Sequence, residues 1–226
     1  MQFTNIAENA LMVKLGETID ISTHKQLITL QQLINTSRRC GLIEAVIGFT
    51  TLTVYFDPLV TSHSDVKKLV INLNTHNNEK VFTPVIHHIP VCYDELYSPD
   101  INYVADYHQL SVEKVIELHI SATYTVYFIG FSPGFPFLGG MSGKLATPRK
   151  SAPRPVIPAG SVGIAGKQTG IYPSQSPGGW QIIGRTPIKL VQLNQKRPTL
   201  LQPGDQIRFY RIKSEEFMQL ANGEGL

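Results

Sequence analysis

The chain has 226 residues, of which 42% are hydrophobic, and its formal net charge is +3 at pH 7. This composition is typical of a folded globular protein, and no apolar run approaches the roughly 20 residues that span a bilayer. The charge is too small to indicate a nucleic-acid partner. The first 15 residues lack the basic start of a signal peptide, and Cys40 and Cys92 form no C-x-x-C pair. We therefore expect a cytoplasmic protein with two free thiols, no nucleic acid and no membrane contact.

Residues 1–88 are expected to form a small α/β domain. A helix with apolar residues three and four positions apart begins near Ser22 or Thr23, either of which can cap it. Two strands follow, a second helix begins after Ser62, and a last strand is expected over residues 81–90. This order of elements is typical of a split β-α-β arrangement.

Residues 89–226 are expected to form a second domain that is rich in short strands. Helices are predicted over residues 99–107 and after Ser111, and a strand over residues 124–131. Beyond these, β segments alternate with turns that contain many Gly and Pro residues. The predicted segments are 160–165, 179–184, 188–193 and 206–210. Many short strands with this punctuation indicate a barrel or a sandwich, so the whole chain belongs to the α+β class.

A long stretch between Glu117 and Asp205 contains no acidic residue. It contains nine cations, namely Lys144, Arg149, Lys150, Arg154, Lys167, Arg185, Lys189, Lys196 and Arg197. This pattern indicates either an uneven surface charge or a basic face that binds an anionic ligand or an acidic partner. Since the stretch offers no carboxylate for acid–base chemistry, it favours one component of a composite site over a self-sufficient enzyme.

A G-x-S-x-G pattern at Gly130–Gly134 resembles the nucleophile elbow of serine hydrolases. The backbone N–H that follows the nucleophile normally belongs to the oxyanion hole, but Pro133 has none. No histidine follows His119 in the chain, although the triad order requires one after the serine. We interpret Ser132 as a turn or ligand-contact residue.

A second pattern, Gly160–Gln168, resembles a phosphate loop only in part. Ser161 stands where the first glycine is required, and Gln168 follows Lys167 where Ser or Thr would bind the metal. The segment is therefore not a P-loop, although its glycines could let backbone N–H groups approach an anion.

The histidines give no clear metal site. His87 and His88 are neighbours on a predicted strand, so their side chains point to opposite faces and cannot bind one ion together. His119 lies on the apolar side of its predicted helix. It is either a buried histidine with satisfied hydrogen bonds or a polar group that points into a pocket, and we expect no metal in this chain.

Aromatic residues occur beside Pro and Gly in the acid-free stretch. They are Phe131, Phe135, Phe137, Tyr172 and Trp180. They either pack as loop residues against the end of the barrel or line an apolar groove, with Gln168, Thr169 and Arg185 aimed into it. Grooves of this kind also hold proline-bearing peptides.

Several motifs in the second half occur together and in a fixed order. They are Gly130–Gly140, Ala146–Lys150, Pro158–Gly166, Gln168–Pro173, Ser176–Trp180 and Gly184–Pro187. With these motifs the chain resembles the family of the 5-oxoprolinase B subunit, which includes the sporulation-kinase inhibitor KipI and is also called allophanate hydrolase subunit 1. The resemblance covers nearly the whole chain and is weakest before residue 40 and after residue 211.

This resemblance implies an N-terminal α/β domain followed by a C-terminal cyclophilin-like β-barrel. It implies one component, inactive alone, of an enzyme that converts 5-oxo-L-proline to L-glutamate with ATP hydrolysis. The implied partners are the 5-oxoprolinase C subunit, of the biotin-dependent carboxyltransferase-like type, and the A subunit, of the LamB/YcsF type. ATP is used by the assembled complex. Two alternatives stay open: a KipI-like inhibitor of a sensor histidine kinase, or a carboxyltransferase-like module for a urea- or allophanate-type substrate.

Within the matching motifs we expect a set of pocket or interface residues, while the catalytic residues stay unassigned. The set is Phe135, Arg154, Gln168, Thr169, Tyr172, Gly178, Gly179, Trp180 and Arg185, with Ser132 and His119 as second-rank candidates. Arg154 or Arg185 is expected to hold a carboxylate or phosphate in a forked geometry. Gly178 and Gly179 are expected to allow close approach of the backbone.

Overall fold

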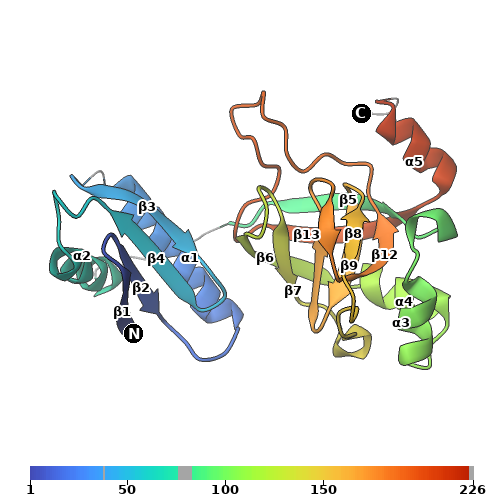
Figure 1. Cartoon of the computed structure of the whole chain (residues 1–226), viewed down its shortest axis with the longest axis horizontal. Helices are drawn as coiled ribbons and strands as arrows, with labels where there is room; N and C mark the ends of the chain where they lie inside the picture. The colour runs from blue at the N-terminus through green and yellow to red at the C-terminus, as the bar shows by residue number, and fades with distance from the viewer. Residues whose placement is uncertain (38, 76–82, 224–226) are drawn as a thin grey trace. The chain divides into compact units, whose positions relative to one another are not determined.

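The computed structural model describes residues 1–37, 39–75 and 83–223. The chain divides into two compact units, Met1–Pro84 and Val85–Leu226 (Figure 1). Within the described ranges, no helix combines the length and the apolar character that crossing a bilayer requires.

The first unit is a four-stranded sheet with two helices: β1 (Gln2–Ala7), β2 (Ala10–Lys14), α1 (Ile21–Thr36), β3 (Leu42–Ile47), β4 (Thr51–Phe56) and α2 (His63–Thr75). The strand order is β1-β2-β4-β3. Both β2 and β3 pair antiparallel with β4, so they run parallel to each other with β4 between them. Since α1 connects β2 to β3, the split β-α-β arrangement that the sequence predicts is confirmed.

The helix starts in this unit agree only in part with the sequence analysis. Ser62 precedes α2, and its hydroxyl accepts the backbone N–H of Asp65 at 3.2 Å, as predicted. The cap of α1 is Asp20, whose carboxylate accepts the N–H of Thr23 at 2.8 Å, so the prediction of Ser22 or Thr23 is wrong. A carboxylate two or three residues earlier satisfies the same free N–H groups of the first turn.

The second unit contains the remaining elements: β5 (Ile86–Cys92), η1 (Glu95–Tyr97), α3 (Ile101–Tyr107), α4 (Val112–Ile120), β6 (Thr123–Ile129), β7 (Pro136–Gly139), η2 (Gly143–Leu145), β8 (Arg154–Ile157), β9 (Ser161–Ala165), β10 (Gln168–Ile171), β11 (Ser176–Gly178), β12 (Gln181–Arg185), β13 (Gln206–Ile212) and α5 (Ser214–Ala221). Seven strands close a barrel in the order β10-β7-β6-β13-β5-β12-β9, and β8 pairs with β11 separately. Figure 1 shows this barrel with α3 and α4 side by side. The mixed α/β architecture with a closed barrel confirms the predicted fold class.

Strand β5 belongs to the barrel and not to the first domain. The sequence predicts a strand over residues 81–90 as the last element of the first domain, but β5 runs parallel to β13 in the barrel, with Ile86 opposite Gln206. Residues 81 and 82 lie outside the described residues. The partner strand is more than 100 residues away along the chain, so no local pattern indicates this pairing.

The prediction of a strand over residues 188–193 is also wrong. These residues lie in a loop, in which an isolated β-bridge joins Val191 to Thr199. Conversely, the short strands β7, β8, β10 and β11 are not predicted, because three or four residues beside Pro and Gly show too little alternation of polar and apolar side chains.

The core of the second unit fills the barrel and reaches under its helices. Its largest fully buried members include Tyr124, Leu138 and Leu145, and Ile116 of α4 belongs to the same cluster. Helix α4 contacts β13, and α3 contacts β12. The N-cap of α4 is Ser111, as predicted, and its hydroxyl accepts the N–H of Lys114 at 3.1 Å.

Candidate functional site

An aromatic groove lies on the second unit, and it gathers the aromatic residues that the sequence singles out. Its volume is about 230 Å³. It is lined by Phe131, Phe135, Phe137, Arg149, Pro153, Tyr172, Pro177, Gly178, Gly179 and Trp180. The residues come from the β6–β7 connection, β7, the segment before β8, and the segments around β11. Separate parts of the chain therefore build one groove.

The floor of the aromatic groove is a cluster of rings around Phe135. The Phe135 ring contacts Tyr172 and Trp180 edge to face, with centroids 5.2 and 5.4 Å apart. These three side chains are buried. Phe131 meets Phe135 edge to face at 5.4 Å, but its own side chain is 68% exposed at the rim. Buried rings packed edge to face therefore form the floor of the groove.

The turn that carries Phe131 is strained. Phe131 has a φ of 66° and Gly134 a φ of 82°. The left-handed region suits glycine, whereas a bulky residue there is a genuine outlier. The N–H of Ser132 donates to the carbonyl of Gly130 at 2.8 Å, and the N–H of Phe135 donates to the carbonyl of Ser132 at 3.0 Å. The turn joins two strands, β6 and β7, whereas a nucleophile elbow joins a strand to a helix.

Of the glycine pair, Gly178 is packed tightly against side chains of its own unit. A Cβ atom there would lie 2.5 Å from the hydroxyl oxygen of Tyr172 and 2.8 Å from a carbon of Ile157. Gly179 is less crowded, since its nearest neighbour would be 3.6 Å away. Burial raises the pKa of Tyr172, which keeps its hydroxyl protonated beside the groove.

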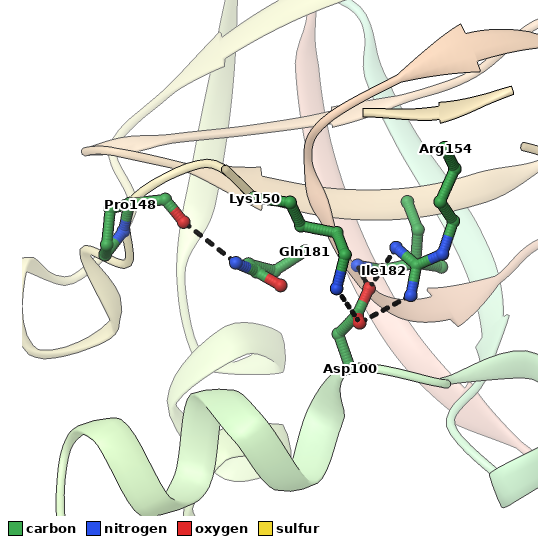
Figure 2. A network of polar contacts seen from close by, with 6 residues as sticks. All are labelled: Asp100, Pro148, Lys150, Arg154, Gln181 and Ile182. Atoms are coloured by element: carbon green, nitrogen blue, oxygen red, sulfur yellow. Dashed lines mark hydrogen bonds and ion pairs between the residues drawn. The ribbon is translucent and has the colours of Figure 1, made fainter. Parts of the chain in front are cut away.

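A polar network lies beside the groove and is centred on Asp100 (Figure 2). The carboxylate accepts two bonds from the Arg154 guanidinium, at 2.8 and 2.6 Å, and one from the backbone N–H of Ile182 at 2.7 Å. The Lys150 ammonium also contacts the carboxylate, with its Nζ 3.2 Å from Asp100 Oδ1. Asp100 sits at the start of α3, so this network ties α3 to β8 and β12. The forked geometry expected of Arg154 exists, and its partner is a carboxylate of this chain.

The charges of this network are set by its hydrogen bonds. Burial alone would raise the pKa of Asp100, but the hydrogen bonds from Arg154 and Ile182 lower it below the ordinary value. The hydrogen bond to Asp100 in turn raises the pKa of Arg154. Both groups are therefore charged at neutral pH. Among the described residues, Lys150 and Arg154 are the two of the nine cations in the acid-free stretch that have an acidic partner.

His119 and Thr169 lie inside the barrel, away from the groove. His119 is fully buried and stacks on Phe209 with ring centroids 4.7 Å apart. The Thr169 hydroxyl donates to the carbonyl of Gly163 at 3.0 Å, so it accepts from His119 Nε2 at 3.1 Å. His119 Nδ1 then accepts from the Tyr93 hydroxyl at 2.8 Å. Burial lowers the pKa of His119 to about 3, so the ring is neutral with its proton on Nε2.

The other predicted site residues take separate positions. Arg154 and Arg185 line a second cavity of about 240 Å³. Arg185 Nε donates to the carbonyl of Ala159 at 2.8 Å. Gln168 is partly buried at the start of β10 and lines neither this cavity nor the aromatic groove. The structure therefore places Phe135, Tyr172, Gly178, Gly179 and Trp180 together and the remaining predicted residues elsewhere.

The segment that resembles a phosphate loop forms a hairpin. Residues 161–165 are β9 and pair with β10 on one side and β12 on the other. A β-ladder on both sides uses the backbone N–H groups that a phosphate would need. The structure thus provides no phosphate cradle in this segment.

Four residues around the groove are not among the predicted site residues: Asp100, Arg149, Lys150 and Gln181. Arg149 and Lys150 end the Ala146–Lys150 motif, which could have indicated them. Asp100 lies outside the acid-free stretch, and the need of buried cations in that stretch for an acidic partner could have indicated it. The sequence carries no signal for Gln181. The groove lining contains a cation and no acid, and no cluster of three His, Cys, Asp or Glu side chains occurs in the described part of the chain.

Comparison with known proteins agrees with this architecture. Residues 1–201 match the family described as carboxyltransferase domain, subdomain C and D. The chain is 40% identical over 230 residues to the 5-oxoprolinase B subunit of Bacillus subtilis, covering 96% of this chain and 95% of that protein. It matches urea amidolyase of Saccharomyces cerevisiae more distantly, at 22% identity over 95% of this chain and 13% of that protein.

A solved structure shares the fold. The crystal structure of TTHA0988 has a TM-score of 0.82 and 35% identity, over 91% of this chain and 40% of that longer chain. The near-complete match to the Bacillus subtilis protein covers both structural units. The chain therefore belongs to the family of the 5-oxoprolinase B subunit, within the carboxyltransferase subdomain C and D proteins.

Proposed function

We propose that this chain is the B subunit of an ATP-dependent 5-oxoprolinase of the cytoplasm. The enzyme opens the lactam of 5-oxo-L-proline to give L-glutamate, with hydrolysis of ATP. The observation that carries the proposal is the 40% identity to a 5-oxoprolinase B subunit of almost the same extent. The C subunit, of the carboxyltransferase-like type, and the A subunit, of the LamB/YcsF type, complete the enzyme.

The chemistry of the groove supports a shared active site. Hydrolysis of a lactam needs a group that activates water and a group that protonates the leaving nitrogen. The groove lining offers a cation, aromatic rings and no carboxylate, and Asp100 beside it is held by Arg154, Lys150 and Ile182. The acid–base groups therefore come from another chain of the complex, and this chain is inactive alone.

The ATP site also belongs to another chain in this proposal. The segment 160–168, with the P-loop-like sequence, is committed to the hairpin of β9 and β10. The chain described here contributes the wall that binds substrate or partner, and the A and C subunits contribute nucleotide binding and the rest of the chemistry.

The test is release of glutamate from 5-oxo-L-proline in the presence of ATP. The experiment compares the chain alone, the mixture with the A and C subunits, and mixtures that each lack one of the three. Activity in the complete mixture, lost when this chain is omitted, is the expected result. No activity in a folded, co-eluting complete mixture would refute the proposal, and inhibition of a sensor histidine kinase would then be measured.

A further inference from the structure

A second cavity of the barrel unit, which we call the arginine cavity, has no assigned role. Its volume is about 240 Å³. The described residues that line it include Arg154 of β8, Ser161 of β9 and Arg185 of β12 among apolar side chains, and none of them is acidic. Pockets for drug-sized ligands are roughly 300–1,000 Å³, so the arginine cavity suits a smaller molecule.

The positive charge of the arginine cavity is only partly compensated. The Arg154 guanidinium donates two hydrogen bonds to Asp100, so this cation already has a carboxylate of its own chain (Figure 2). Arg185 has no acidic partner in the part of the chain that the structure describes. The cavity therefore offers one unpaired guanidinium to an anionic ligand.

Two contacts hold the side chain of Arg185 in place. Its Nε donates to the carbonyl of Ala159 at 2.8 Å, and its guanidinium carbon lies 5.9 Å from the centre of the Phe217 ring. No described residue bonds to its two terminal nitrogens, so their N–H groups are available. Two terminal N–H groups can bind both oxygens of one carboxylate in a forked geometry.

Ser161 is the direct neighbour of Arg185 in the barrel. The two residues stand opposite each other in the antiparallel pair of β9 and β12, so their side chains lie on the same face of the sheet. Ser161 is 2% exposed, and no described residue bonds to its hydroxyl. Within the described ranges, the fully enclosed unpaired side-chain oxygens belong to Ser176 and Gln181, so the Ser161 oxygen keeps access to the cavity. Its hydroxyl is therefore a second donor for an anion beside Arg185.

The rest of the lining favours a ligand with a compact apolar body. Leu96 and Val156 border the cavity and are 81% and 51% exposed, so a bound ring removes apolar surface from water. An ammonium group on the ligand finds no acid among the described lining residues, and the Arg185 cation repels it. The cavity therefore favours a ring that carries a carboxylate over an open-chain amino acid.

We infer that the arginine cavity binds a small monocarboxylate with a compact ring, its carboxylate on the Arg185 guanidinium and the Ser161 hydroxyl. Within the proposed function, on which this identification rests, the ligand is 5-oxo-L-proline, whose lactam nitrogen carries no charge. The product L-glutamate carries an ammonium group and is rejected. The cavity thus retains the substrate and releases the product.

The test is a calorimetric binding titration of the full chain, alone and in the co-eluting complex, with four compounds. Cyclopentanecarboxylate has the ring and the carboxylate of 5-oxo-L-proline without the lactam, whereas 2-pyrrolidinone has the lactam without the carboxylate. We expect both ring acids to bind, and 2-pyrrolidinone to bind at least about tenfold more weakly, because it leaves Arg185 unpaired. We expect L-glutamate to bind at least about tenfold more weakly as well, because its ammonium group has no partner in the lining.

Two variants and a matched control locate the binding site. Arg185→Gln removes the guanidinium and weakens binding of both ring acids by about tenfold. Ser161→Ala removes one oxygen and weakens it by about threefold; this small change keeps the test valid if Arg185→Gln loses stability. Arg197→Gln makes the same substitution at an exposed arginine outside the cavity and leaves binding unchanged.

Several outcomes would overturn the inference. They are no binding of either ring acid to the chain or the complex, equal binding of 2-pyrrolidinone, and unchanged binding in both Arg185→Gln and Ser161→Ala. Loss of binding in Arg149→Gln instead would place the acid in the aromatic groove and would also reject the cavity.

The failure of this inference can be told apart from the failure of the proposed function. Binding of cyclopentanecarboxylate without binding of 5-oxo-L-proline would keep the cavity as a carboxylate site and refute the identification of the ligand. Glutamate release, measured on the same complex, decides the proposed function independently. An active complex in which neither acid binds at the cavity would keep the function and reject the site.

Discussion

Replacement of Asp100 by alanine is expected to destabilise the second unit strongly. The carboxylate is 5% exposed and accepts bonds from Arg154, Lys150 and the backbone N–H of Ile182. The substitution leaves a guanidinium without its partner and a buried N–H without an acceptor. It also frees the start of α3 from β8 and β12.

The magnitude follows from these lost contacts. Removal of one partner of a buried ion pair costs about 3–5 kcal/mol, and an unpaired buried N–H costs about 1–3 kcal/mol. The two contributions overlap, because the same carboxylate serves both groups and neighbouring interactions are not additive. Lys150 is about one-third exposed and adds little. Because Arg154 is itself 27% exposed, we expect a loss at the lower end of this range, about 3 kcal/mol, in the free energy of unfolding of the second unit.

The measurement is urea denaturation followed by the fluorescence of Trp180. Trp180 is the one tryptophan of the chain and lies in the second unit, so its signal reports that unit alone. The control is Asp106→Ala, an exposed aspartate on α3, which is expected to change stability by less than about 0.5 kcal/mol. A loss below about 1 kcal/mol for Asp100→Ala would refute the reasoning, because the desolvation of Asp100 would then nearly cancel its bonds.

Two other predictions concern the barrel interior and the rim of the groove. Burial lowers the pKa of His119 to about 3, so NMR should show a neutral ring with Nε2–H down to about pH 4. In the unfolded chain the pKa of His119 is near 6.5. The stability that comes from the neutral buried ring is therefore complete above about pH 6.5 and is lost as the pH falls toward 3. A His119 ring that titrates near pH 6 in the folded protein would contradict this prediction. At Phe131, where φ is 66°, glycine should be more stable than alanine by about 1 kcal/mol in urea denaturation, because alanine retains the left-handed strain. An alanine variant at least as stable as the glycine variant would show that Phe131 is not strained.

Part of the local structure can be read from the sequence. Ser111 and Ser62 are predicted to precede helices, and the structure places them there, because capping depends on residues within one turn. The split β-α-β arrangement and the barrel class follow from the order of short periodic segments. The ordered motifs also indicate the family, and the 40% identity to a 5-oxoprolinase B subunit confirms it.

The candidate site can be predicted only in part. Phe135, Tyr172 and Trp180 are predicted to be pocket residues because they are large rings beside Pro and Gly in the barrel loops, and the structure places all three in one groove. It does not indicate that Thr169 bonds to His119 inside the barrel. Strand pleat decides which side of β10 faces inward, and that register is set by partner strands rather than by the local segment.

From the sequence alone, therefore, only local features follow: the helix starts after Ser62 and Ser111, the alternation of the longer strands, the absence of acids between Glu117 and Asp205, and the family motifs. Which distant groups meet depends on the tertiary structure. Strand β5 joins β13 across more than 100 residues, and Asp100 meets Arg154 across 54. Neither contact has a periodic signature, because each depends on barrel closure, which brings together segments whose separate sequences carry no record of their neighbours.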